Sequence, residues 1–281
     1  MRFAIKTAPQ NTTWAEMLAV FRAADDIEVF ESGWTFDHFY PIFSDPTGPC
    51  LEGWTTTTAL AQATQRLRVG VMVTGNPYRH PAVLANIAAT LDVISNGRLE
   101  LGIGAGWNQE ECDAYGIDLP PLRERFDRLE EALQVIVGLL RDETTDFDGR
   151  YYRLAQARCE PKPVQRPHPP VCIGGGGERR TLPIAARWAQ HWNLAGGPPD
   201  VFAHKRDVLL DQCRRIGRDP GEITMSVQVH LGHDQEPAEV ADQAGRFADV
   251  GCDLVVIPLG QPHDPAVLEP LAEALAPLAG E

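Results

Sequence analysis

The chain of 281 residues lacks the features of several large classes of protein. No apolar run approaches the roughly 20 residues of a membrane-spanning helix. The N-terminal segment MRFAIKTAPQ has no long apolar core of the kind that signal peptides contain. No C-x-x-C pair occurs, and six cysteines are too few in a chain of this length for a disulfide framework. We therefore expect a cytoplasmic protein with reduced thiols.

Basic residues are also scarce. The 25 lysines and arginines are outnumbered by 39 acidic residues, which gives a formal net charge of −14. This balance argues against nucleic acid as a partner, because nucleic acid requires a basic surface, and against an anionic membrane. Residues 150–187 depart from the trend, since they contain eight basic and only two acidic residues. Such a cluster is usually solvated surface, and the alternative is a site for a small anion.

Short β-branched runs alternate with longer amphipathic segments, a pattern typical of βα units around a parallel sheet. A hydrophobic content of 43% is sufficient for a large core. The spacing predicts eight strands, at 2–6, 28–34, 68–73, 98–104, 170–173, 191–194, 223–230 and 253–257. Helices are predicted from a capping box at Thr13 and Glu16 and at 83–94, 122–140, 178–188, 199–216, 237–250 and 265–275.

Eight strands that are each followed by a helical segment favour an α/β fold, a (β/α)8 TIM barrel that takes in residues 1–281 as one domain. A doubly wound open sheet is the alternative. Between the fourth helix and the fifth strand, residues 142–169 form an insertion, which contains the turn Asp148-Gly149 and a proline-rich stretch. We expect a small hairpin and an extended return there. In such barrels the chemistry lies at the C-terminal ends of the strands.

The clearest glycine signal is the run Gly174, Gly175, Gly176 and Gly177, which closes the predicted fifth strand and is followed by Arg179 and Arg180. Glycines allow a backbone to approach a phosphate closely, and a helix N-terminus offers free N–H groups. The run also lies within the basic cluster. We predict a phosphate site here, and the alternative is an ordinary glycine-rich turn.

A second glycine-rich segment ends the predicted fourth strand, in the order Gly104, Ala105, Gly106, Trp107 and Asn108. The small residues leave room for a flat ligand. Trp107 offers a stacking face and Asn108 offers hydrogen-bonding groups. The alternative for this segment is close packing of backbones.

Polar residues follow the second and third strands. Asp37 and His38 are adjacent and lie between aromatic residues, so the histidine could move a proton near neutral pH. A structural histidine at a loop start is the alternative. Thr74 and Asn76 could contact the polar edge of a ring, whereas His80 before Pro81 is better interpreted as a helix cap.

No metal site is predicted. His230 and His233 form the nearest H-x-x-H pattern, and no carboxylate partner for them can be recognised. A Ser-His-Asp hydrolase is not indicated either, since G-x-S-x-G is absent.

Taken in order, these motifs resemble the luciferase-like flavin/deazaflavin oxidoreductases, and within them the subgroup that uses coenzyme F420, a 5-deazaflavin. The motifs that carry the resemblance are Asp37-His38-Phe39, Val73-Thr74, Arg79-His80-Pro81-Ala-Val-Leu-Ala, Gly102-Ile-Gly-Ala-Gly-Trp-Asn108, Phe147-Asp-Gly-Arg-Tyr-Tyr152, Pro161-Lys-Pro-Val-Gln165 and the run Gly174–Gly177.

The resemblance implies a (β/α)8 barrel whose insertion covers the mouth of the pocket, and it implies a homodimer. It implies hydride transfer between F420 and a small organic substrate, with Asp37 and His38 near the reactive ring. It further implies a non-proline cis peptide near Val71 and Met72, in the third strand. We hypothesise that His38 exchanges a proton with the substrate while Asp37 holds its ring.

One residue departs from the resemblance. In members that oxidise a sugar phosphate, a glutamate follows the Gly-x-Gly of the fourth strand, whereas Trp107 occupies that place here. A sugar phosphate is therefore not the expected substrate. Two alternatives remain open from the residues: an FMN-dependent monooxygenase that uses molecular oxygen, and a flavin- or deazaflavin-binding protein without catalytic activity.

Overall fold

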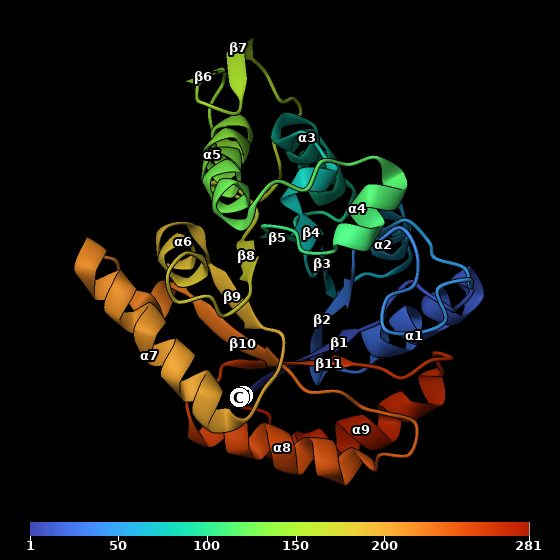
Figure 1. The fold of residues 1–281 in the computed structure, drawn as a ribbon. Helices are drawn as coiled ribbons and strands as arrows, with labels where there is room; N and C mark the ends of the chain where they lie inside the picture. Colours follow the sequence, from blue (N-terminus) through green and yellow to red (C-terminus); the bar gives the residue numbers. More distant parts are fainter. Residues whose placement is uncertain (281) are drawn as a thin grey trace.

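Parallel strands close into a barrel in the computed structural model, which describes residues 1–280 (Figure 1). The sheet runs in the order β3-β2-β1-β11-β10-β9-β8-β5-β4, and a further pairing of β3 with β5 closes the ring. This closure makes the fold a (β/α)8 barrel, so the alternative of an open doubly wound sheet is wrong. The strands are β1 (Arg2–Lys6), β2 (Phe30–Thr35), β3 (Arg68–Val71), β4 (Thr74–Gly75), β5 (Leu99–Gly104), β8 (Val171–Gly174), β9 (His191–Leu194), β10 (Thr224–Gln228) and β11 (Leu254–Pro258).

Helices form the outer layer of the barrel (Figure 1). They are α1 (Trp14–Asp26), α2 (Gly53–Ala63), α3 (Pro81–Ile94), α4 (Gln109–Tyr115), α5 (Leu122–Arg141), α6 (Thr181–Trp188), α7 (Pro199–Ile216), α8 (Pro237–Asp249) and α9 (Leu268–Leu275). The predicted capping box is present, because the Thr13 hydroxyl accepts from the Glu16 N–H and the Glu16 carboxylate accepts from the Thr13 N–H. His80 caps α3 as predicted, its Nδ1 accepting from Ala82 N–H. No helix within residues 1–280 is both long and apolar enough to cross a membrane.

The insertion contains the predicted hairpin. Strands β6 (Thr145–Asp148) and β7 (Arg153–Ala157) pair antiparallel and extend beyond the end of α5 (Figure 1). The Glu131 carboxylate of α5 anchors the turn, since it accepts hydrogen bonds from the backbone N–H groups of Arg150, Tyr151 and Tyr152 at 2.9–3.2 Å. The Tyr152 hydroxyl accepts from the Asn76 amide at 3.2 Å, so the hairpin is also tied to the barrel end.

The inside of the barrel is filled by side chains, as is usual for this fold. One buried cluster lies there, composed of Ala4, Trp34, Met72, Cys172, Leu254 and Val256. A larger buried cluster packs the outer faces of the strands against the helices. The filled interior leaves the strand ends as the place where a ligand can be held.

Three details differ from the sequence-based expectation. Helices α2 and α4 were not individually predicted. The predicted third strand is divided into β3 and β4, and the bend between them contains a cis peptide bond at Met72–Val73. That bond lies one residue beyond the place that the resemblance implied.

Candidate active site

A cavity of about 760 Å³ opens at the C-terminal ends of the barrel strands. Its walls come from β1, β4, β8, β9, β10, β11 and the loops that follow β2 and β5. Most of the lining side chains are apolar or aromatic, and the backbone of Gly104, Gly106, Gly174 and Gly175 forms part of the wall. A shaped apolar space with a few polar groups is the usual form of a small-molecule site.

The central polar group of the cavity is the imidazole of His38. Its Nδ1 lies 2.8 Å from Oε2 of Glu111, a fully buried carboxylate at the start of α4. The same carboxylate accepts from the Tyr78 hydroxyl at 2.6 Å and from the Phe39 N–H at 2.5 Å. Burial alone acts to raise the pKa of Glu111, but these hydrogen bonds outweigh it and lower that pKa.

An ionised Glu111 requires a hydrogen on Nδ1 of His38, and this fixes the tautomer of the neutral ring. Nε2 then carries the lone pair. No residue in the described chain hydrogen-bonds to Nε2, and His38 lines the cavity. The arrangement leaves one ring nitrogen available to a bound molecule as proton acceptor, or as donor when the ring is charged.

The expectation that Asp37 holds His38 is wrong. The Asp37 carboxylate forms a two-point ion pair with Arg79, with N–O distances of 2.5 and 3.0 Å. Arg79 also pairs with Glu52, the N-cap residue of α2, at 2.6 Å. Adjacent residues in an extended segment point in opposite directions, so Asp37 faces the helix layer while His38 faces the cavity. Asp37 does not line the cavity.

Two aromatic side chains stand at the mouth. Phe43 and Trp107 stack with parallel rings 5.6 Å apart, and Trp107 also meets the His38 ring edge-on at 5.7 Å. Phe43 is 91% exposed and Trp107 is 53% exposed, although both line the cavity. These exposed faces are suited to contact with a flat or apolar ligand.

The glycine run stands on the opposite side of the barrel from β1. Gly175 has φ +113°, a conformation that residues with a side chain rarely adopt, and its N–H is bonded to Asn193 O. The N–H groups of Gly176 and Gly177 have no acceptor within residues 1–280. Free N–H groups ahead of α6 fit the predicted phosphate site. The positive φ of Gly175 is a further reason for glycine in this run, in addition to close approach.

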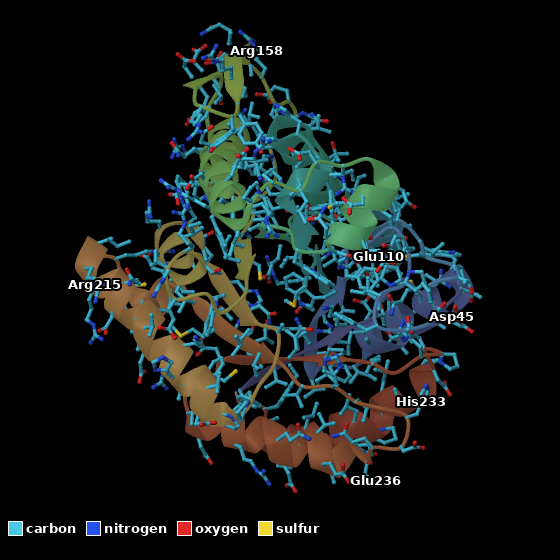
Figure 2. The ribbon with its side chains drawn as sticks, viewed as in Figure 1. Asp45, Glu110, Arg158, Arg215, His233 and Glu236 are labelled. Atoms are coloured by element: carbon cyan, nitrogen blue, oxygen red, sulfur yellow. The ribbon has the colours of Figure 1, made fainter. Side chains whose placement is uncertain are left out.

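The basic cluster does not form one surface. Arg150, Arg153 and Arg158 are exposed on the hairpin and do not line the cavity, and Figure 2 shows Arg158 at the outer end of the hairpin. Arg180 pairs with Asp127 of α5. Arg179 is exposed and has no ion-pair partner among the described residues. The Arg179 guanidinium, next to the glycine run, is therefore free to pair with a bound anion.

The remaining predicted residues fall into two groups. Met72, Thr74, Gly104, Ala105, Gly106, Trp107, Gly174 and Gly175 line the cavity together with His38. Asp37, Val71, Asn76, Asn108, Gly176, Gly177, Arg179 and Arg180 do not. Asn108 is occupied as the N-cap of α4, accepting from Glu111 N–H at 3.2 Å. No group of three metal-ligating side chains occurs within residues 1–280.

Residues 1–276 of the chain match the family model for luciferase-like monooxygenases. The chain belongs to the luciferase-like monooxygenase family. It is 30% identical over 261 residues to an F420-dependent glucose-6-phosphate dehydrogenase of Kineococcus radiotolerans, an alignment that covers 92% of this chain and 75% of the relative.

Solved structures of other proteins share this fold. One is an F420-dependent secondary alcohol dehydrogenase in complex with an F420–acetone adduct, with a TM-score of 0.88, 18% identity and full coverage of both chains. Another is the F420-dependent tetrahydromethanopterin reductase of Methanopyrus kandleri, with a TM-score of 0.84, 18% identity and 99% coverage of both. At such low identity these likenesses support the barrel of this luciferase-like chain and not its substrate.

Proposed function

We propose that this luciferase-like protein is an oxidoreductase that transfers a hydride between coenzyme F420 and a small organic substrate. The observation that carries the proposal is the His38 imidazole, fixed by a buried carboxylate and with one free ring nitrogen in an apolar cavity. The relatives named for F420 favour this cofactor over FMN. The aromatic mouth and the buried His38–Glu111 pair favour an enzyme over a passive carrier.

The residues present fit a phosphorylated, flat cofactor. The free N–H groups of Gly176 and Gly177 would hold the phosphate, with Arg179 adding charge. Met72, Thr74, Gly104, Ala105 and Gly106 would border the ring. Thr74 Oγ accepts from Trp54 Nε1 at 2.6 Å, so its own proton remains free for a ring oxygen. When bound, F420 supplies the hydride chemistry at its deazaflavin carbon.

The protein's part in the reaction is then orientation and proton transfer. His38 gives or takes the accompanying proton at Nε2, while Glu111 keeps the proton on Nδ1 and stabilises the charged ring. The apolar walls exclude water from the reacting atoms. Asp37 contributes by ordering the loop through its ion pair with Arg79.

Separate titrations with F420 and FMN test the choice of cofactor. We expect the fluorescence of F420 to change on binding to the purified protein, with saturation at micromolar concentrations, and FMN to bind at least ten-fold more weakly. Tight binding of FMN alone would overturn the proposal in favour of the monooxygenase. Binding of F420 without turnover of any alcohol, aldehyde, ketone or enone would favour the alternative of a deazaflavin-binding protein without catalytic activity.

The two arginines beside the glycine run give a matched test of the phosphate site. We expect Arg179→Gln to weaken F420 binding about five- to ten-fold, because an uncommitted guanidinium is lost. Arg180→Gln should leave that affinity within two-fold, because Arg180 is already paired with Asp127. Equal effects of the two substitutions on the dissociation constant would contradict this assignment.

We further propose that the chain works as one domain, as a homodimer and in the cytoplasm. The family resemblance supports the first two and the acidic composition with six free cysteines supports the third. Light scattering during size-exclusion chromatography tests the dimer, with an expected mass near twice the 30.9 kDa of the chain.

A further inference from the structure

The cavity contains one formal charge that the proposed chemistry does not use. Among its lining residues there is a single lysine, Lys6, and there is no arginine, aspartate or glutamate. Lys6 is the last residue of β1, so its ammonium group belongs to the wall of the cavity. A lone positive charge in an apolar site is unusual in a chain of net charge −14.

The ammonium group is only partly satisfied by the protein. Its one hydrogen-bond acceptor among the described residues is Gln228 Oε1, at 3.1 Å, and no carboxylate in the described chain pairs with it. An ammonium has three donors, so two N–H groups remain for a ligand. Cations that are half-buried in an apolar cavity are normally paired, and no anion of the described chain pairs with Lys6.

A series of hydrogen-bonded polar groups orients the Gln228 amide so that its oxygen points to the Lys6 ammonium group. Gln228 Nε2 donates to Asn193 Oδ1 at 2.9 Å, and Asn193 Nδ2 donates to Ser226 Oγ at 2.8 Å. Ser226 is held in turn by His191 at 2.6 Å, and His191 by Glu100 at 2.9 Å. Because the amide nitrogen of Gln228 donates to Asn193, the amide oxygen faces Lys6. This oxygen carries no formal charge, so it positions the ammonium group without neutralising it.

This charge is separate from the predicted phosphate site. In the closed ring, four steps in either direction lead from β1 to β8, so Lys6 and the glycine run occupy opposite walls of the barrel. Lys6 lies instead one strand from β2, whose following loop contains His38. An anion bound by Lys6 would therefore be close to the proposed proton-transfer group.

We propose that Lys6 binds a carboxylate of the substrate, so that the substrate is an organic acid with an apolar or aromatic body. The proposal rests on the proposed function, because it names the substrate class of that same cavity. The apolar walls and the Phe43–Trp107 pair accommodate the body, and the two spare N–H groups of Lys6 donate hydrogen bonds to the carboxylate.

The protonation of Lys6 agrees with this role. Burial lowers its pKa to about 8, partly offset by the nearby Cys172. Burial and the charge of Lys6 also lower the pKa of His230, a second titratable group near Lys6 besides Cys172, so His230 is neutral at pH 7. Since Lys6 is charged below a pKa of about 8 and neutral above it, carboxylate binding should be strong at pH 7 and weaken as the pH rises through 8.

Matched pairs of acids and amides test the proposal in the F420-loaded protein. The probes are benzoate with benzamide and 2-naphthoate with 2-naphthamide, whose dissociation constants are measured by calorimetry at pH 7. For at least one pair we expect a preference of ten-fold or more for the carboxylate, the usual value of a charge-assisted hydrogen bond. Lys6→Met and Gln228→Glu should both abolish it, the second by neutralising the lysine, whereas Lys6→Arg should retain part of it.

Arg141→Met is the control, because Arg141 is exposed and paired with Asp142 at the end of α5, and neither residue lines the cavity. The proposal is overturned if neither pair shows a preference, if the preference survives Lys6→Met, or if it exists only without F420, which would assign Lys6 to the cofactor. The same titrations in the protein without cofactor keep the two proposals apart. Should F420 fail to bind while the Lys6-dependent preference persists, the cofactor assignment is wrong and the anion site stands.

Discussion

At the scale of single residues, the buried carboxylate of Glu111 determines which ring nitrogen of His38 is free to contact a bound molecule. It accepts from His38, Tyr78 and the backbone of Phe39 at once, so it has no freedom to turn away. A histidine held in this way has one tautomer when neutral and a nearby countercharge when protonated. Both properties are needed for a group that passes a proton in an apolar cavity.

Substitutions at these two positions should have different consequences. We expect His38→Ala to reduce turnover by about 10²- to 10⁴-fold, the usual contribution of a general acid or base, while the F420 dissociation constant changes less than three-fold. Glu111→Gln should reduce turnover less, and the nitrogen chemical shifts of His38 should reveal a mixture of tautomers. Glu110→Gln is the control, because its side chain is exposed. Full turnover in His38→Ala would remove this residue from the mechanism.

Of the His38–Glu111 pair, the sequence predicts the histidine and not the glutamate. His38 was found because it follows a strand and is flanked by aromatic residues. Glu111 lies 73 positions later in the chain, and no local pattern connects the two. The neighbouring Asp37 was chosen instead, although adjacent residues of an extended segment face opposite sides. Lys6 was missed for a similar reason, since its environment is formed by strands distant in sequence.

At the scale of secondary-structure elements, most strands were predictable because their β-branched runs are short and clearly separated. His191–Leu194 and Pro199–Ile216 have the predicted bounds. The failures have physical causes. Helix α2 contains four consecutive threonines, Thr55 to Thr58, which have low intrinsic helix propensity, and tertiary packing overrides it. Helix α4 has only seven residues, too few for a helical period to be recognised.

The hairpin illustrates an element held by one side chain. Glu131→Ala removes the acceptor of three turn N–H groups, so we expect hydrogen exchange in residues 145–157 to accelerate by about ten-fold or more. The exchange of the barrel strands should not change. Glu130→Ala on the same helix is the control, because that side chain bonds to Arg187 and Trp188 instead. Unchanged protection of the hairpin in Glu131→Ala would show that the turn is held by other contacts.

At the scale of the whole molecule, the ion pairs at the N-terminal end of the barrel couple its stability to pH. Burial acts to raise the pKa of Glu100, but His191 and Arg68 outweigh it and hold the pKa at about 2, below its ordinary 4.5. A carboxyl with a depressed pKa stabilises the fold above pH 4.5 and loses that contribution as the pH falls towards 2.

Urea unfolding of wild type and Glu100→Gln at several pH values tests this coupling. We expect the variant to be less stable at pH 7 by about 3 kcal/mol, and the difference to shrink steadily below pH 4.5. Glu124→Gln, which alters a partly exposed pair with Arg128, should differ from wild type by less than about 1 kcal/mol at every pH. A constant difference between Glu100→Gln and wild type across this range would mean that the contribution of Glu100 is not its charge.

The net charge of −14 also governs how an anionic cofactor reaches the cavity. At about 10 mM salt the Debye length is roughly 30 Å, so an approaching anion experiences the whole acidic molecule and is repelled. At about 150 mM it is roughly 8 Å, and only local groups such as Arg179 act on the anion. We therefore expect the association rate of F420, followed by stopped-flow fluorescence, to increase between these conditions. The dissociation rate should rise as well, because salt weakens the contacts to the phosphate. An association rate that falls on addition of salt would mean that local positive charge guides the anion even at long range.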